Sequence, residues 1–154
     1  MKHFKKKTQQ PRSTFIPKAV LILVDEENRI GLLQSTHDSN LWQLPETTIH
    51  PKETLEASLT QDCINEFNLE IENLIISNAF TERQEAFEEE LFIVTTVYYT
   101  DLFKFKENQT QIEFFDLEHL PLNMDKEHLK YIEDYNHVIE KQFMKYVLLN
   151  GQMF

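Results

Sequence analysis

The sequence contains very little glycine and cysteine, and both shortages restrict what the protein can be. Only 2 of its 154 residues are glycine, Gly31 and Gly151, so the chain has no glycine-rich phosphate loop. The single cysteine, Cys63, excludes an intrachain disulfide and fits a reducing compartment, from which we expect a cytoplasmic location. No apolar run approaches the roughly 18 residues of a membrane helix, and the N-terminus lacks the apolar core of a signal peptide.

Basic residues are also scarce relative to acidic ones. The chain has 15 Lys and Arg against 26 Asp and Glu, a formal net charge of -11. A surface of this sign repels nucleic acids and anionic membranes, which argues against a role in coating either. It would also repel an anionic diphosphate unless a metal ion or a local basic cluster intervened. The length suits one globular domain, which we place at residues 15–154 after a flexible basic N-terminal segment, residues 1–14.

Apolar patterning predicts an α/β fold of the α+β kind. We expect strands at about residues 15–24, 29–34, 71–80, 91–100 and 111–115, with the first two forming a hairpin and with an acidic loop at 81–90. Helices are predicted at about residues 54–67 and 125–147, where apolar residues recur at helical spacing. This order predicts a mixed β-sheet between helices that pack on its opposite faces.

The stretch from residue 41 to residue 69 carries the main functional signal, because a polar loop there leads into an amphipathic helix. Thr54 is placed to cap the helix through its hydroxyl, and Asp125 is placed to cap the later one. The apolar residues of the first helix recur every four positions and form a stripe for burial: Leu55, Leu59, Cys63 and Phe67. Cys63 is therefore expected to be a small core residue rather than a nucleophile.

The opposite face of this helix carries acidic side chains. Asp62 and Glu66 are four residues apart and share a face, with Asn65 beside them, and Glu53 ends the preceding loop. Mg²⁺ binds to one or two protein carboxylates and leaves positions for phosphate oxygens, so this pattern is compatible with a metal site. On spacing alone, two acids four apart are more often just the solvated face of a helix.

Read as one continuous segment, these residues resemble the Nudix box, the signature of the Nudix hydrolases: G-x5-E-x7-R-E-U-x-E-E-x-G-U, where U is aliphatic. In a gap-free alignment Glu53, Glu66 and Leu69 are identical to the pattern, and Asp62 keeps the charge of a glutamate. The segment 41–45, LWQLP, is similar to the W-x-L-P lead-in that is common in the family.

The departures from the pattern concern charge and backbone freedom. Asn65 replaces a carboxylate with an amide, and Gln61 replaces the arginine that usually helps to position acidic residues of the box. Glu46, Thr47 and Lys52 stand where loop glycines are usual, so we expect the loop to follow a different path. Asn68, in place of the last glycine, is the mildest change, since Asn tolerates a left-handed conformation.

The resemblance implies a Nudix-like α/β/α sandwich and metal-dependent hydrolysis of a nucleoside diphosphate linked to another moiety. It implies Mg²⁺ or Mn²⁺ as the cofactor, Asp62, Glu66 and Asn65 as metal ligands, and Glu53 and Glu66 as catalytic residues, while no substrate-binding residue can be assigned. A different reading is a Nudix-fold nucleotide-binding or regulatory module without turnover. A third is a structural unit that forms a homodimer through the apolar tail, residues 146–154.

Other candidate residues carry weaker signals. The histidines show no metal-binding spacing and are each expected at the surface: His37, His50, His119, His128 and His137. The acidic run is expected to be a solvated loop, with a further metal-binding acid as the alternative: Glu85, Glu88, Glu89 and Glu90. Three aromatic residues are expected to fill the core rather than to stack on a base: Trp42, Phe80 and Tyr99.

Overall fold

The computed structural model describes residues 12–37, 40–86, 88–107 and 111–150. Its elements in chain order, separated by short loops, are β1 Arg12–Leu23, β2 Ile30–Gln34, β3 Trp42–Gln43, β4 Glu46–Thr48, α2 Leu55–Phe67, β5 Leu69–Ile71, β6 Ile75–Ala86, β7 Glu89–Thr100, β8 Phe103–Phe105, β9 Glu113–Phe115, the short 3₁₀ helix η1 Leu117–His119, and α3 Lys126–Asn150.

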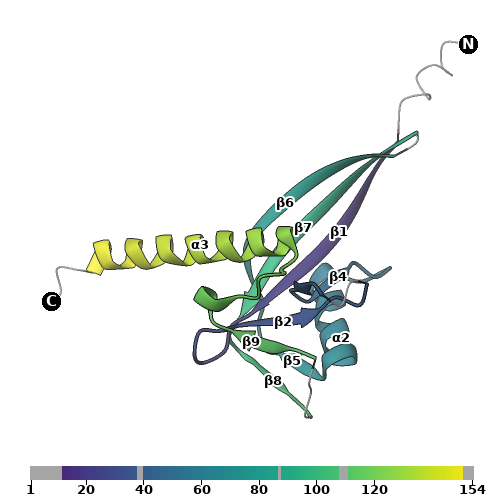
Figure 1. Ribbon diagram of the computed structural model, residues 1–154. Coiled ribbons are helices and arrows are strands. Elements are labelled where there is room, and N and C mark those ends of the chain that lie inside the picture. The colour runs from purple at the N-terminus through teal and green to yellow at the C-terminus, as the bar shows by residue number, and fades with distance from the viewer. Residues whose placement is uncertain (1–11, 38–39, 87, 108–110, 151–154) are drawn as a thin grey trace, which may run out of the picture.

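The largest sheet has the strand order β4-β1-β7-β6. It is mixed, because β1 runs parallel to β7 but antiparallel to β4, and β6 is antiparallel to β7. Strand β2 pairs with β3 and β9, and β5 pairs with β8, in two smaller sheets. The strands β1, β6 and β7 extend together as a long curved ribbon, while α3 runs away from the body in another direction (Figure 1).

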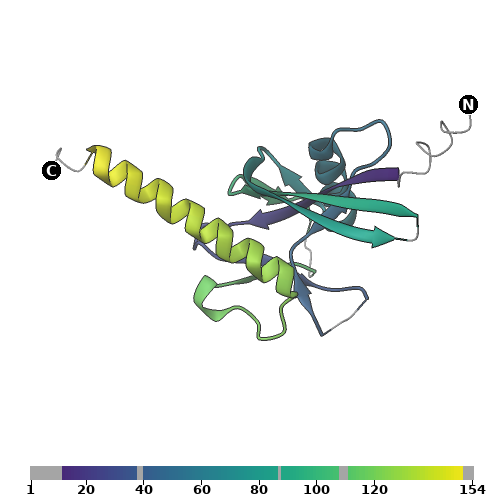
Figure 2. The same cartoon turned by 90° about the horizontal axis from the view of Figure 1, so that it is seen from above.

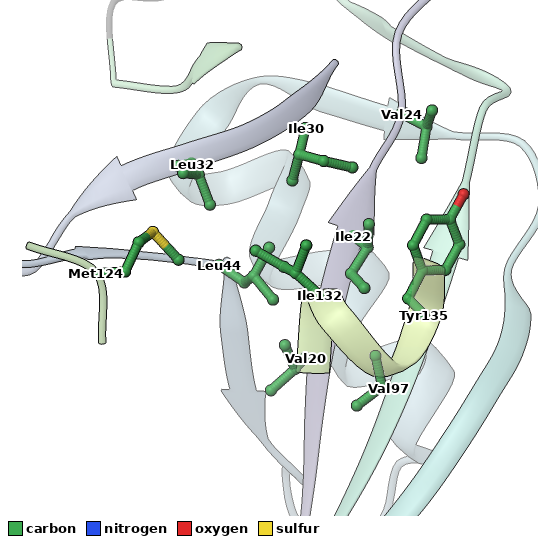
Figure 3. Packing of buried hydrophobic residues seen from close by; sticks show 10 residues of the cluster. All are labelled: Val20, Ile22, Val24, Ile30, Leu32, Leu44, Val97, Met124, Ile132 and Tyr135. Carbon is green, nitrogen blue, oxygen red and sulfur yellow. The ribbon is translucent and has the colours of Figure 1, made fainter. Parts of the chain in front are cut away.

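The two helices pack on opposite faces of β1, as the sequence predicts. Alternate residues of this strand belong to two different clusters, because side chains point to opposite faces along a strand. Val20, Ile22 and Val24 pack with Ile132 and Tyr135 of α3 (Figure 3). On the other face the β1 residues join the apolar stripe of α2, in a cluster that includes Ala19, Leu21, Leu23, Leu59, Cys63 and Phe67.

Helix α2 begins and ends where local sequence signals indicate. The Thr54 hydroxyl accepts a hydrogen bond from Ala57 N at 3.1 Å, which satisfies one of the free amides of the first turn. Asn68 ends the helix with φ 54°, and its backbone N–H donates to the Cys63 and Ile64 carbonyls. Asp125 caps α3, since its Oδ1 accepts hydrogen bonds from Glu127 N and His128 N at 3.0 and 3.1 Å.

Two strand predictions were wrong. The strands β1 and β2 do not form a hairpin: they meet at one bridge, Val24 with Ile30, and then enter different sheets. Residues 81–90 are not an acidic loop, because β6 continues to Ala86 and β7 begins at Glu89. This polar ribbon is held by backbone pairing, which is independent of side-chain hydrophobicity, and by an ion pair between Arg83 and Glu90.

The ends of the chain also differ from the expected boundaries. Strand β1 begins at Arg12, so residues 12–14 belong to the sheet, whereas residues 1–11 of the expected N-terminal segment lie outside the described part. Helix α3 extends to Asn150, beyond the predicted end at 147. Neither helix that the structure describes is long and apolar enough to cross a membrane.

Candidate functional site

The segment that leads into the loop is held by backbone hydrogen bonds from two directions. Trp42 N donates to Asn123 O at 3.0 Å, and Asp125 N donates to Trp42 O at 2.8 Å, which ties the start of α3 to β3. On the other side, Leu21 N in β1 donates to Pro45 O at 2.9 Å. These bonds hold the start of the loop before α2 between strand β1 and the N-terminus of α3.

The loop then folds back onto the first turns of α2 through Ser58, a fully buried residue. His50 N donates to Ser58 Oγ at 2.9 Å, and Ser58 Oγ donates to Glu53 Oε2 at 3.2 Å. Lys52 takes φ 65° in this turn. At this glycine-type position Lys52 thus keeps a left-handed conformation, at the steric cost that a Cβ imposes.

His50 lies between two of the acids that the sequence singled out. Its Nε2 is 3.1 Å from Asp62 Oδ1, and its Nδ1 is 3.3 Å from Glu53 Oε2. Only a positively charged ring, with a proton on each nitrogen, can donate to both carboxylates. His50 is partly exposed, and its two acidic partners are 3 and 12 positions away, so they meet only when the loop folds.

The acids of the α2 face repel one another. Burial, and then the negative charge of Asp62, raise the pKa of Glu66 above its ordinary value. Asn65, the amide between them in sequence, accepts a hydrogen bond from Gln61 Nε2 at 3.0 Å. Of the four predicted site residues, Glu53 and Asp62 are linked through His50, and the charge of Asp62 acts on Glu66, while Asn65 is held by Gln61.

A pocket of about 570 Å³ opens beside Glu66. Its wall combines apolar and hydrogen-bonding side chains from β2, β3, α2 and the segment at β9: Leu33, Gln34, Thr36, Trp42, Glu66, Phe67, Gln111 and Glu113. Trp42 packs against Phe115 with the ring centroids 5.0 Å apart, which fixes the indole at the pocket wall. Ligand pockets in proteins commonly have this mixed lining and a volume of a few hundred Å³.

A second charged cluster, which the sequence did not reveal, lies on the other side of the lead-in. Glu46 Oε2 is 2.9 Å from Lys18 Nζ and 3.0 Å from His128 Nε2. His128 is buried, contrary to expectation, and its Nδ1 accepts a hydrogen bond from Leu44 N at 2.9 Å. Because Nδ1 is an acceptor, the Nε2 proton is the one donated to Glu46. Spacing gave no sign of this cluster, since its members come from β1, β4 and α3.

These partners control the ionisation of Glu46. Burial opposes the charged form, but hydrogen bonds from His128 and Lys18 outweigh it and lower the pKa of Glu46 from 4.5 to about 2. The carboxylate at this glycine-type position therefore joins three elements next to the loop.

The donor set near α2 fits a loosely held divalent cation better than a closed metal cage. Across residues 12–37, 40–86, 88–107 and 111–150, no three His, Cys, Asp or Glu side chains are arranged to hold a metal ion. Asp62 and Glu66 offer two mutually repelling carboxylates, the oxygen ligands that Mg²⁺ and Mn²⁺ prefer. Two carboxylates suffice where water and substrate phosphate oxygens supply the remaining ligands.

Comparison with known proteins finds solved structures with a similar fold but no protein of similar sequence. No family model matches the chain, and no curated protein matches it. A MutT NUDIX hydrolase from Burkholderia pseudomallei is similar in structure, with a TM-score of 0.63 at 17% identity over 79% of this chain and 98% of that one.

Two further solved structures have a similar fold. The NUDIX domain of Shewanella oneidensis NrtR, in complex with ADP ribose, has a TM-score of 0.56 at 14% identity over 82% of this chain and 88% of that one. The Escherichia coli ORF135 protein has a TM-score of 0.54 at 12% identity over 82% and 91%. The expected fold is confirmed by these similarities.

Proposed function

We propose that this chain, which has the Nudix fold, hydrolyses a nucleoside diphosphate linked to another moiety, with Mg²⁺ or Mn²⁺ as cofactor. The observation that carries the proposal is the pair Asp62 and Glu66 on one face of α2, with Glu66 in the wall of the pocket of about 570 Å³. The name of a structural neighbour, a MutT NUDIX hydrolase, supports the same reaction class.

In this proposal the residues of α2 and of the loop before it have distinct roles. Glu66 is the principal metal ligand, Asp62 the second, and Asn65 a neutral one. Glu53 orients the acidic cluster and is itself held by His50 and Ser58. When bound, Mg²⁺ or Mn²⁺ would neutralise phosphate oxygens and polarise the attacking water.

The pocket beside Glu66 is proposed to hold the part of the substrate beyond the diphosphate. Trp42 offers an aromatic ring, while Gln34, Thr36 and Gln111 bring amide and hydroxyl groups that recognise sugar or base edges. The ADP ribose in the NrtR complex is a nucleoside diphosphate joined to a sugar, which makes this ligand class the first to test. We also place the protein in the cytoplasm, since a reducing compartment suits the buried free thiol of Cys63.

The test is a turnover assay on a broad panel of nucleoside diphosphate sugars and related diphosphates, with Mg²⁺ or Mn²⁺ present or chelated. The expected product is a nucleoside monophosphate, released slowly because the site has two carboxylates where the family pattern has three. Glu66→Gln should remove this activity, and Asn65→Glu should raise it by restoring a ligand charge. Glu70→Gln is the matched control, because Glu70 pairs with Lys104 and Lys106 away from the pocket.

The alternative is a nucleotide-binding module without turnover, and one observation favours it. Asp62 and Glu53 already have a partner in His50, and Asn65 is bonded to Gln61, so the chain itself satisfies part of the site. Calorimetry separates the two functions. Metal-independent binding of ADP ribose, together with an Asn65→Glu variant that stays inactive, would establish the module and rule out the hydrolase.

A further inference from the structure

Helix α3 carries an apolar stripe that continues past the edge of the body. Ile132 and Tyr135 are buried in the core, and the stripe continues at helical spacing through Ile139, Phe143 and Tyr146. Beyond Ile139 the helix leaves the body: Figures 1 and 2, viewed at right angles, both show its C-terminal half projecting with no other element beside it. The same kind of surface is therefore covered in one half of the helix and exposed in the other.

The projecting half is unusually apolar for an exposed helix. Its large side chains are exposed over much of their surface: Phe143 63%, Met144 56%, Tyr146 62%, Val147 40%, Leu148 78% and Leu149 74%. With about 200 Å² for each large side chain, these six together expose on the order of 750 Å², spread around the whole circumference of the helix because residues 143 to 149 span almost two turns. A stable interface buries about 800 Å² on each partner, so a partner has to cover more than one face of this helix.

We propose that the projecting half of α3 is an interface with a second copy of this chain, formed by antiparallel pairing of the two helices. The stripe around Phe143 and Tyr146 lies against the same stripe of the copy, as a two-fold interface requires. This arrangement leaves the bodies at opposite ends of the helix pair, so that each helix tip reaches the body of the other copy.

Charge supports a copy of this chain as the partner. The charged residues between 139 and 150 are Glu140, Lys141 and Lys145, so the projecting half is slightly basic while the whole chain has a net charge of -11. In the antiparallel arrangement each basic tip meets an acidic body, which attracts the two copies. A tip of this kind also has too few basic residues to hold an acidic protein on an anionic membrane.

The body offers an apolar edge where α3 leaves it. Asn78 in β6 bonds to Asp134 of α3 at 2.9 Å, and earlier in the same strand Ile75, which pairs with Tyr99 on the α3 face of the sheet, has 41% of its surface exposed. Leu102, also half-exposed, is bonded through its carbonyl to Glu72 N. The tip of the copy would cover this edge.

Sedimentation velocity on the full chain between 1 and 100 µM tests the proposal. The wild type is expected to sediment as a dimer, and Phe143→Glu combined with Tyr146→Glu should weaken dimerisation at least 100-fold. Leu122→Glu is the matched control, because Leu122 is fully exposed outside α3 and should leave the dimer intact. Circular dichroism checks that each variant remains folded.

A second measurement fixes the orientation. A Tyr146→Cys variant should form a crosslinked dimer through its new thiol under mild oxidation, since the antiparallel pairing brings the two positions 146 together, while Cys63 stays buried. A wild type that is monomeric at 100 µM would overturn the proposal. So would a dimer that survives the double substitution, or a monomer that instead binds vesicles of phosphatidylcholine and phosphatidylserine through α3.

Discussion

Replacing Glu46 by glutamine removes a charge while keeping the size of the side chain, and the structure gives the expected cost. The Glu46 carboxylate is held by Lys18 from β1 and by the buried His128 of α3. A glutamine oxygen can still accept from His128, but it cannot pair with the ammonium group of Lys18. The substitution therefore removes the ionic part of a junction between β1, β4 and α3.

The lowered pKa of Glu46 sets the size and the pH range of this effect. A change from 4.5 in the unfolded chain to about 2 in the folded one corresponds to at most about 3 kcal/mol. Since 31% of the side chain is exposed, solvent screening reduces the expected contribution to about 1–2 kcal/mol. The contribution is complete above about pH 4.5 and is lost as the pH falls toward 2, because the folded carboxylate then becomes protonated too.

Urea unfolding of the wild type and of Glu46→Gln, from pH 7 down to pH 3, measures this difference. The gap in unfolding free energy should be constant near neutral pH and should narrow below about pH 4.5. Glu70→Gln serves as the control, because Glu70 bonds to exposed lysines and should give a much smaller gap. A gap for Glu46→Gln that is absent at pH 7, or that does not change with pH, would refute the assignment of this stability to the charged junction.

Three further substitutions or reactions test local features. Lys52→Gly should raise the unfolding free energy by up to about 1 kcal/mol, and Lys52→Val should lower it by about 1 kcal/mol, because φ at this position is 65°; chemical denaturation measures both. Gly31→Ala should lower it by about 1–3 kcal/mol, since a Cβ would lie 3.0 Å from Ile112 Cγ2, and a variant as stable as the wild type would mean that Ile112 moves aside at little cost. The thiol of Cys63 should be inert to a disulfide reagent at pH 8 until urea unfolds the chain, because burial, followed by the charges of Asp62 and Glu66, raises its pKa to about 12; rapid labelling of the native protein would contradict this.

The sequence predicted those parts of the fold whose causes are local. The start and end of α2 follow from Thr54 and Asn68, which act within one helical turn. Burial of its stripe, and the packing of the helices on opposite faces of the sheet, follow from periodicity. The polar ribbon of β6 and β7 escaped prediction, because ladder hydrogen bonds form between backbones whatever the side chains are.

The sequence predicted only the part of the candidate site that lies on helix α2. Asp62 and Glu66 share a face because of their spacing, and that inference needed no tertiary structure. The roles of His50 and His128 depend on contacts across 12 and 82 positions, to Asp62 and to Glu46 respectively. A histidine gives no sign in the sequence of which carboxylate it will meet, so neither contact was predicted, and the buried His128 was wrongly expected at the surface.

The most direct test of the metal-dependent hydrolase is the binding of Mn²⁺ alone, followed by the loss of the electron paramagnetic resonance signal of the free ion. Because Asp62 and Glu66 are the proposed charged ligands, we expect one weakly bound Mn²⁺ per chain, at least ten-fold weaker binding by Glu66→Gln, and tighter binding by Asn65→Glu. Glu70→Gln should bind like the wild type. Equal Mn²⁺ binding by the wild type and Glu66→Gln, or no binding by either, would contradict the account.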